Sequence, residues 1–167
     1  MADAYRTIAS PVGELVLTAS GTGLTGVFFP TSRPHPGGEG ERTSESGSEA
    51  ILDRTESQLN EYFAGKRTAF DLPLEPSGTT FQLRVWELLR RIPYGATASY
   101  GELARQLGDP HKSRAVGAAN GANPIPIIVP CHRVVGSKGE LTGFGGGLDR
   151  KRWLLEHEGA LMRLGDR

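Results

Sequence analysis

The sequence predicts an α+β protein, in which a small N-terminal antiparallel sheet with one helix precedes a mostly helical C-terminal domain. Short β-favouring runs separated by turn residues fill the start of the chain, and apolar residues at helical spacing dominate its second half. The charge balance changes as well. Residues 1–80 carry six basic and eleven acidic side chains, a net charge of −5, whereas residues 81–167 carry thirteen and eight, a net charge of +5. We therefore expect two domains, 1–78 and 79–167.

The N-terminal domain is expected to begin with an antiparallel meander. Residues 5–8, 14–19 and 24–29 are β-favouring runs, and the Gly- and Pro-containing segments between them have turn chemistry. Residues 30–48 are rich in Gly, Ser, Pro and Glu and hold almost nothing apolar, which predicts a mobile loop.

A helix is expected after this loop, because a set of apolar residues shares one helical face. These residues are Ile51, Leu52, Leu59, Tyr62 and Phe63. Gly65 should end the helix, and residues 71–78, which contain prolines, should be the linker between the domains. This half contains no catalytic constellation, so we assign it a structural role.

The C-terminal domain should open with a helix that ends before Pro93. Its buried stripe is formed by Phe81, Val85, Leu88, Leu89 and Ile92.

Two short helices are predicted next. Ser99 and Glu102 match a capping box, which favours a helix that ends at Gly108. Asp109 and Pro110 supply an N-cap and a first-turn proline for another helix, which should reach Asn120. Two short helices joined by a glycine turn are a helix-turn-helix candidate.

The second helix of this pair is unusually smooth. After Arg114 it is built from small side chains, including Ala115, Gly117, Ala118 and Ala119. Such a helix suits the narrow minor groove of DNA, where shape matters more than base sequence. Small residues can equally serve close packing against neighbouring helices, and the helix by itself does not distinguish the two interpretations.

The only cysteine of the chain, Cys131, lies in the string Pro130-Cys131-His132-Arg133-Val134-Val135. One thiol can form no intramolecular disulfide and supplies no multi-cysteine zinc site, so we expect a reducing compartment, the cytoplasm, and no metal. No apolar stretch approaches the roughly 20 residues that span a bilayer, which predicts that the protein does not enter a membrane. A thiol beside a histidine that can take its proton is a candidate nucleophile.

A glycine-rich loop and a helix follow the cysteine. The loop, residues 143–147, has one aromatic, Phe144, and lacks the lysine and spacing of a P-loop, so we expect no nucleotide triphosphate site. On the helix 148–158, Glu158 follows Leu154 by four residues and Leu155 by three, which places its carboxylate near the apolar face. A carboxylate there needs a partner, and a histidine would complete a set of nucleophile, base and orienting group.

Residues 81–159 resemble the O6-alkylguanine-DNA alkyltransferases, the suicide repair proteins also called methylated-DNA--protein-cysteine methyltransferases. The resemblance rests on the following strings: Phe81-Gln82-Leu83-Arg84-Val85-Trp86, Ile92-Pro93-Tyr94-Gly95, Ser99-Tyr100, Arg114-Ala115-Val116-Gly117, Asn123-Pro124, Pro130-Cys131-His132-Arg133-Val134 and the glycine loop. The N-terminal half resembles the family more loosely.

The resemblance implies roles for four residues around the cysteine. Cys131 would accept the alkyl group, His132 would take its proton through a water molecule, and Glu158 would orient the histidine. Asn123 would bridge the turn after the recognition helix to the active-site segment. The alkyl group would stay on Cys131, so each molecule would repair one lesion without a cofactor.

The resemblance also implies a binding surface for double-stranded DNA that contains O6-alkylguanine, and by extension O4-alkylthymine. Arg114 would fill the gap left by a flipped nucleotide, and the small residues of its helix would lie in the minor groove. Tyr100 would hydrogen-bond guanine, help to rotate the target phosphate and protonate the leaving base. The pocket would be lined by Pro126, Val134, Phe144, Gly145 and Gly146. Phe144 replaces the tyrosine of many members, which keeps stacking and removes a hydroxyl. We expect a monomer, and clustering on DNA stays open.

Two other classes of protein fit part of this pattern. A cysteine hydrolase of Cys-His-Glu type would use the same three residues, but a histidine directly after the cysteine is unusual for that geometry. A non-catalytic protein that binds alkylated DNA would keep the fold and replace the acceptor cysteine. The presence of Cys131 favours transfer over both.

Overall fold

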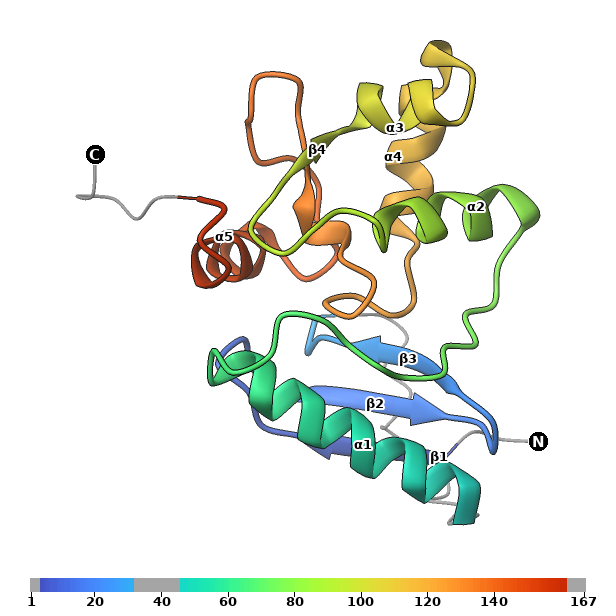
Figure 1. The fold of residues 1–167 in the computed structure, drawn as a ribbon, viewed down its shortest axis with the longest axis vertical. Coiled ribbons are helices and arrows are strands. Elements are labelled where there is room, and N and C mark those ends of the chain that lie inside the picture. Colours follow the sequence, from blue (N-terminus) through green and yellow to red (C-terminus); the bar gives the residue numbers. More distant parts are fainter. Residues whose placement is uncertain (1–3, 32–45, 162–167) are drawn as a thin grey trace. The chain divides into compact units, whose positions relative to one another are not determined.

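The structure, a computed structural model, describes residues 4–31 and 46–161, and the chain divides into two compact units, residues 1–77 and 78–167. In the first unit, β1 (Ala4–Ile8), β2 (Leu15–Ala19) and β3 (Leu24–Phe28) form an antiparallel sheet in the order β1-β2-β3 (Figure 1). This is the expected meander. All five residues of the central strand are buried, which makes β2 the core of the unit.

Helix α1 (Ser46–Phe63) covers one face of this sheet (Figure 1). It buries Leu52, Leu59 and Tyr62 completely, and Gly65, at φ +76°, ends it by adopting a left-handed conformation. The loop expected at 30–48 lies largely outside the described residues. Its last residues are helical, because α1 already begins at Ser46.

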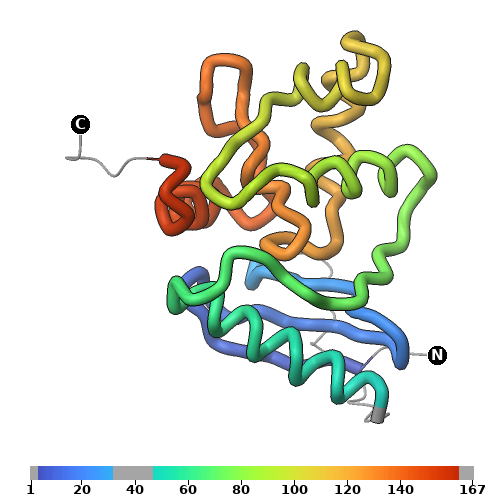
Figure 2. The backbone as a smooth tube through the Cα atoms, viewed as in Figure 1, coloured from blue at the N-terminus to red at the C-terminus, as the bar shows by residue number. Residues whose placement is uncertain are grey.

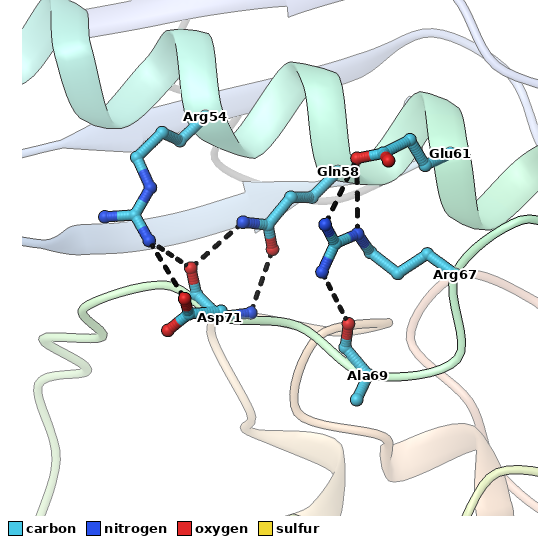
Figure 3. A network of polar contacts seen from close by, with 6 residues as sticks. All are labelled: Arg54, Gln58, Glu61, Arg67, Ala69 and Asp71. Carbon is cyan, nitrogen blue, oxygen red and sulfur yellow. Dashed lines mark hydrogen bonds and ion pairs between the residues drawn. The ribbon is translucent and has the colours of Figure 1, made fainter.

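The segment after α1 is bound to the first unit as far as residue 75, although the sequence predicts a linker from residue 71 onward. The Gln58 side chain pairs with the backbone of Asp71 through both its amide nitrogen and its oxygen, at 3.0 and 2.9 Å, and Figure 3 shows this contact beside the Arg67 contacts to Glu61 and Ala69. Leu24 of β3 then exchanges two backbone hydrogen bonds with residues 73–75. The expected linker, 71–78, is therefore fixed to the sheet and to α1 over most of its length.

The second unit begins with α2 (Thr80–Leu89). A full capping box, in which Thr79 and Gln82 satisfy each other's backbone amides, starts this helix. The helix ends at Leu89, three residues before Ile92, which the sequence placed in its apolar stripe and which is buried in the following turn.

The expected helix pair is present with one change. Helix α3 (Tyr100–Gln106) begins at Ser99, whose side chain accepts a hydrogen bond from Glu102 N. The second helix is broken into a 3-10 turn, η1 (Pro110–Lys112), and α4 (Ser113–Gly121). Asp109 caps the turn as expected, by accepting from His111 N.

A two-stranded parallel sheet, not expected from the sequence, brings the helix pair to the cysteine. In it β4 (Ala98–Ser99) lies beside β5 (Val134–Val135), and Ala98 is the register partner of Val134. Figure 2 traces the chain from α4 through residues 122–130 into the turn before β5. Helix α5 (Leu148–His157) closes the unit, and its C-cap is Glu158. Within the described residues, no helix has the length and apolarity that a membrane crossing would need.

Candidate active site

Cys131 lies in a tight, buried turn. The turn η2 (Cys131–Arg133) is held by backbone hydrogen bonds from Cys131 N to Val129 O, at 2.8 Å, and from Arg133 N to Pro130 O, at 3.0 Å. Cys131 is 5% exposed. Strand β5 follows the turn directly, so the pairing of β5 with β4 fixes the cysteine relative to the start of α3.

Burial raises the pKa of the Cys131 thiol to about 11, although a hydrogen bond from Asn123 and the nearby charge of Lys151 act in the opposite direction. The resting thiol is therefore protonated at neutral pH. Any reaction in which the sulfur acts as a nucleophile needs a base that removes this proton.

Asn123 braces the segment that leads to the cysteine. Its Nδ2 donates to Val129 O at 2.8 Å, and its Oδ1 accepts from Ile125 N at 3.0 Å. Between these two contacts Ile127 has φ 74°, a conformation that costs a β-branched residue about 1–3 kcal/mol. The Asn123 side chain thus spans a strained, buried loop and holds both of its ends.

His132 and Glu158 are in direct contact. His132 Nε2 lies 2.8 Å from Glu158 Oε2, and both side chains have no exposed surface. Glu158 reaches this position because it caps the C-terminus of α5, where the chain turns into Gly159 at φ +76°. The sequence argument from the apolar face of the helix thus placed the carboxylate correctly.

Arg133 completes the charge balance of this pair. Its Nε and Nη2 donate to the two oxygens of Glu158 at 2.8 and 3.0 Å, and its Nη1 donates to Ile92 O at 2.7 Å. The Tyr94 ring lies against the guanidinium, with 5.8 Å between its centroid and the guanidinium carbon. A carboxylate paired in this bidentate way stays ionised although it is buried.

The ring of His132 is set up as a base. Burial lowers its pKa, and the contact with Glu158 only partly offsets this, so the imidazole is neutral at pH 7. The carboxylate accepts a hydrogen bond, which assigns the ring proton to Nε2 and leaves the lone pair on Nδ1. Nδ1 is buried and has no hydrogen-bond partner among the described residues.

A pocket of about 790 Å³ opens beside the start of α3. Its lining includes Tyr100, Arg114, Gly117, Thr142, Phe144 and Gly145. The phenol of Tyr100 contacts the Thr142 hydroxyl at 2.8 Å. Of the residues expected in the substrate pocket, Phe144 and Gly145 line this space. Pro126, Val134 and Gly146 are buried and do not line it, so their contact with a ligand stays a prediction.

Helix α4 has two different faces. Val116, Ala119 and Asn120 point inward at helical spacing, and Trp86 Nε1 donates to Ala119 O at 2.8 Å. Arg114, Ala115 and Ala118 are exposed on the other face, and Gly117 is partly exposed. The inward face therefore has the close-packing role of small residues, and contact of the exposed face with DNA stays a prediction. The expectation of DNA contact at Ala119 does not fit the structure, because its side chain is 3% exposed and packs inside.

Comparison with known proteins assigns both units to one family. The DNA binding domain of 6-O-methylguanine DNA methyltransferase matches residues 80–160, and its ribonuclease-like domain matches residues 4–76. The chain belongs to this family. It is 52% identical, over 92% of its length and 91% of the relative's, to a methylated-DNA--protein-cysteine methyltransferase of Mycobacterium tuberculosis.

Other members agree. A methyltransferase of the same name from Mycobacterium leprae is 50% identical over 92% of this chain and 90% of its own. The crystal structure of Mycobacterium tuberculosis OGT in complex with DNA superimposes with a TM-score of 0.82, at 52% identity and 92% coverage of both chains. The α+β fold expected from the sequence is confirmed.

The structure places the residues that the family resemblance singled out in two groups. Cys131, His132 and Glu158 are buried, and the half-buried Asn123 hydrogen-bonds the segment before the cysteine. Tyr100 and Arg114 line the pocket, whose lining does not include these four residues. Their catalytic and binding roles stay predictions.

Three residues with clear places in the site escaped the sequence analysis. Arg133 carried a signal only as part of the cysteine string. Lys151 is completely buried, donates to Val134 O and Thr142 O at 2.6 and 2.7 Å, and has its pKa lowered by burial to about 8. It precedes Leu154 and Leu155 by three and four residues, so the argument used for Glu158 predicts its position too. Thr142 carried no signal in the sequence.

Proposed function

We propose that this protein repairs O6-alkylguanine in duplex DNA by transferring the alkyl group irreversibly to its own Cys131, as a methylated-DNA--protein-cysteine methyltransferase. The observation that carries the proposal is the buried lone pair on His132 Nδ1, in the residue next to a protonated thiol, with the opposite nitrogen held by Glu158. Family membership over both units supports the same reaction.

The proposed chemistry starts with proton transfer. The thiol proton of Cys131 passes to His132 Nδ1 through a water molecule, and the thiolate attacks the alkyl carbon in line with the bond to guanine O6. A sulfur–carbon bond forms as the carbon–oxygen bond breaks. Glu158 stabilises the imidazolium, and Arg133 keeps Glu158 ionised and fixed, so the charge that develops on His132 is already compensated.

Guanine leaves as a neutral base when it receives a proton, and we propose Tyr100 as the donor because its phenol lines the pocket. The product is a thioether, which has no easy leaving group. Cys131 is therefore not regenerated, and each molecule acts once without a cofactor.

The partner in this proposal is double-stranded DNA, and a relative of known structure forms a complex with DNA. An O6-alkylguanine inside a duplex must be rotated out to reach a buried thiol. We assign the exposed face of α4, with Ala115, Gly117 and Ala118, to the minor groove, and Arg114 to the space that the flipped nucleotide leaves. The N-terminal unit would be structural. We propose a monomer in the reducing cytoplasm, and clustering on DNA is a separate question of stoichiometry.

The test is the intact mass of the protein after mixing with a duplex that contains one O6-methylguanine. A gain of one methylene equivalent, located on Cys131 by peptide mapping, is the expected result. Unchanged mass with tight binding to the lesion would identify a damage-binding protein instead. A transient acyl adduct with turnover of ester substrates would identify a hydrolase. The same assay with O4-methylthymine tests the second lesion.

A further inference from the structure

Tyr100 is in contact with a second hydroxyl inside the pocket. Its Oη lies 2.8 Å from Thr142 Oγ1, and either atom can be the donor. Both side chains are partly exposed and both line the pocket. The contact joins the first residue of α3 to the segment between β5 and α5, which are far apart in the sequence.

Both residues of this pair are tied to the strands beside the cysteine. Tyr100 directly follows β4, which pairs with β5. Thr142 is tied to β5 by Lys151, whose ammonium group donates to Thr142 O at 2.7 Å and to Val134 O at 2.6 Å. Thr142 therefore has little freedom to move relative to Cys131, and its hydroxyl is a fixed point for the end of the tyrosine side chain.

The direction of this hydrogen bond matters for chemistry. A phenol has one proton, and if Tyr100 donated it to Thr142 the proton would not be free for a ligand. If Thr142 donates instead, the tyrosine proton can point to a base in the pocket. The phenolate that remains after the proton has left would then still accept a hydrogen bond from Thr142, and hydrogen bonds to an ionised oxygen are about twice as strong as neutral ones.

We propose that Thr142 is a positioning residue that acts through Tyr100: its hydroxyl holds the phenol towards the bound base and stabilises the phenolate formed when Tyr100 protonates the leaving guanine. The proposal rests on the proposed function, since it concerns the departure of guanine. In the step considered, the carbon–oxygen bond breaks, its electron pair moves into the purine ring, and the Tyr100 proton binds to a ring nitrogen.

The experiment compares Thr142→Val, which keeps the shape and removes the hydroxyl, with Thr142→Ser, which keeps the hydroxyl. Single-turnover rates of methyl transfer from an O6-methylguanine duplex are measured by intact mass. Thr142→Val should be slower by about tenfold, the effect of one charge-assisted hydrogen bond, and Thr142→Ser should recover most of the rate. In a Tyr100→Phe background Thr142→Val should cause no further loss, because both changes remove the same interaction.

Alkylation of Cys131 by iodoacetamide is the control reaction, since iodide leaves without a proton. Thr142→Val should leave this rate unchanged. An equal slowdown with iodoacetamide, or an additive loss in the Tyr100→Phe background, would mean that Thr142 supports the fold of the pocket and would overturn the proposal. If the wild-type protein gains no methyl group, the proposed function itself fails. If the wild type transfers and Thr142→Val transfers equally fast, only this inference fails.

Discussion

The buried cluster around Cys131 and the exposed face of α4 lie in the same unit and are built in opposite ways. His132, Arg133 and Glu158 are all buried, and short contacts join each of the first two to Glu158 in the free protein. Arg114, in contrast, is exposed and makes no ion pair with any described residue. A catalytic group gains from being fixed before the substrate arrives, whereas a side chain that enters DNA must give up no contact to do so.

This difference predicts where substitutions act. Substitutions in the buried cluster should reduce transfer from every substrate. Those that leave a buried charge without its partner should also reduce stability. Changes on the exposed face of α4 should matter only when the substrate is a duplex. The effects on transfer should decrease in size from the acceptor thiol outward.

The largest effect is expected at Cys131. Cys131→Ser replaces the sulfur with an oxygen that is a far weaker nucleophile, so transfer should be abolished while binding to lesion-containing duplex persists. Intact mass and a fluorescence binding titration measure the two properties separately. Stoichiometric methylation of the variant would remove Cys131 from the acceptor role.

The base comes next. His132→Ala should slow transfer by about 10²- to 10⁴-fold, the usual contribution of a general base. If His132 and Glu158 act as one unit, the double variant with Glu158→Ala should be no slower than the slower single variant. Losses that multiply in single-turnover assays would instead make Glu158 a purely structural residue.

The third effect concerns stability. Arg133→Met leaves the Glu158 carboxylate buried without its bidentate partner, which should lower the free energy of unfolding by about 3–5 kcal/mol. Arg90→Met is the matched control, because it removes an exposed pair with Glu87 at 3.7 Å and should cost less than about 1 kcal/mol. Urea denaturation measures both. Similar losses for the two variants would show that the cluster does not depend on Arg133.

Much of the fold and of the buried cluster could be predicted from the sequence. The features that could not be predicted were missed for physical reasons. Strands, helices and their glycine stops depend on local patterns, which is why the meander and the position of Glu158 were predicted. The pairing of β4 with β5 involves two residues on each side that are far apart in the chain, and strands this short carry no periodic signal. The contact between Thr142 and Tyr100 depends on that pairing and was equally invisible.

Helix α4 shows a different kind of limit. Its small residues fit both close packing and a DNA groove, and only the three-dimensional structure shows that Ala119 lies on the buried face and Ala118 on the exposed face. The Trp86 hydrogen bond to Ala119 O, which fixes the inward face, joins residues 33 positions apart. The local sequence could predict the helix, but which of its faces is buried depends on how the whole unit packs.

The fourth effect is specific to duplex DNA. Arg114→Ala should slow repair of a duplex by about tenfold, because the variant no longer offsets the cost of flipping a nucleotide. Transfer from the free base O6-benzylguanine, which needs no flipping, should be unchanged. Arg114→Lys should recover only part of the loss, since an ammonium cannot stack or form a planar fork of hydrogen bonds. An equal slowdown with both substrates would mean that Arg114 supports the pocket.

The smallest effect is expected when the pH is changed. It tests whether burial shifts the pKa values of His132 and Cys131 as the structure indicates. In the proposed mechanism, proton transfer starts from a neutral His132 and a protonated Cys131. Burial lowers the pKa of His132 below its usual 6.5 and raises that of the thiol to about 11. From pH 7 to pH 8 both groups are therefore mainly in these states, and the single-turnover rate should change by less than about twofold across this range. Lys151, with a pKa of about 8, is half deprotonated at about pH 8, and above that pH it loses most of the charge beside Thr142.

The pH dependence of the free energy of unfolding tests the direction of the His132 pKa shift. Because its pKa is lowered in the folded protein, His132 takes up a proton at a higher pH in the unfolded chain than in the folded one. The unfolded state then binds more protons, so the free energy of unfolding must fall as the pH falls. Between pH 7.5 and pH 5.5 the urea midpoint should therefore fall more for the wild type than for His132→Gln. The other histidines are the same in both proteins. An equal drop would show that burial does not lower the pKa of His132, and this support for a neutral base in the proposed mechanism would be lost.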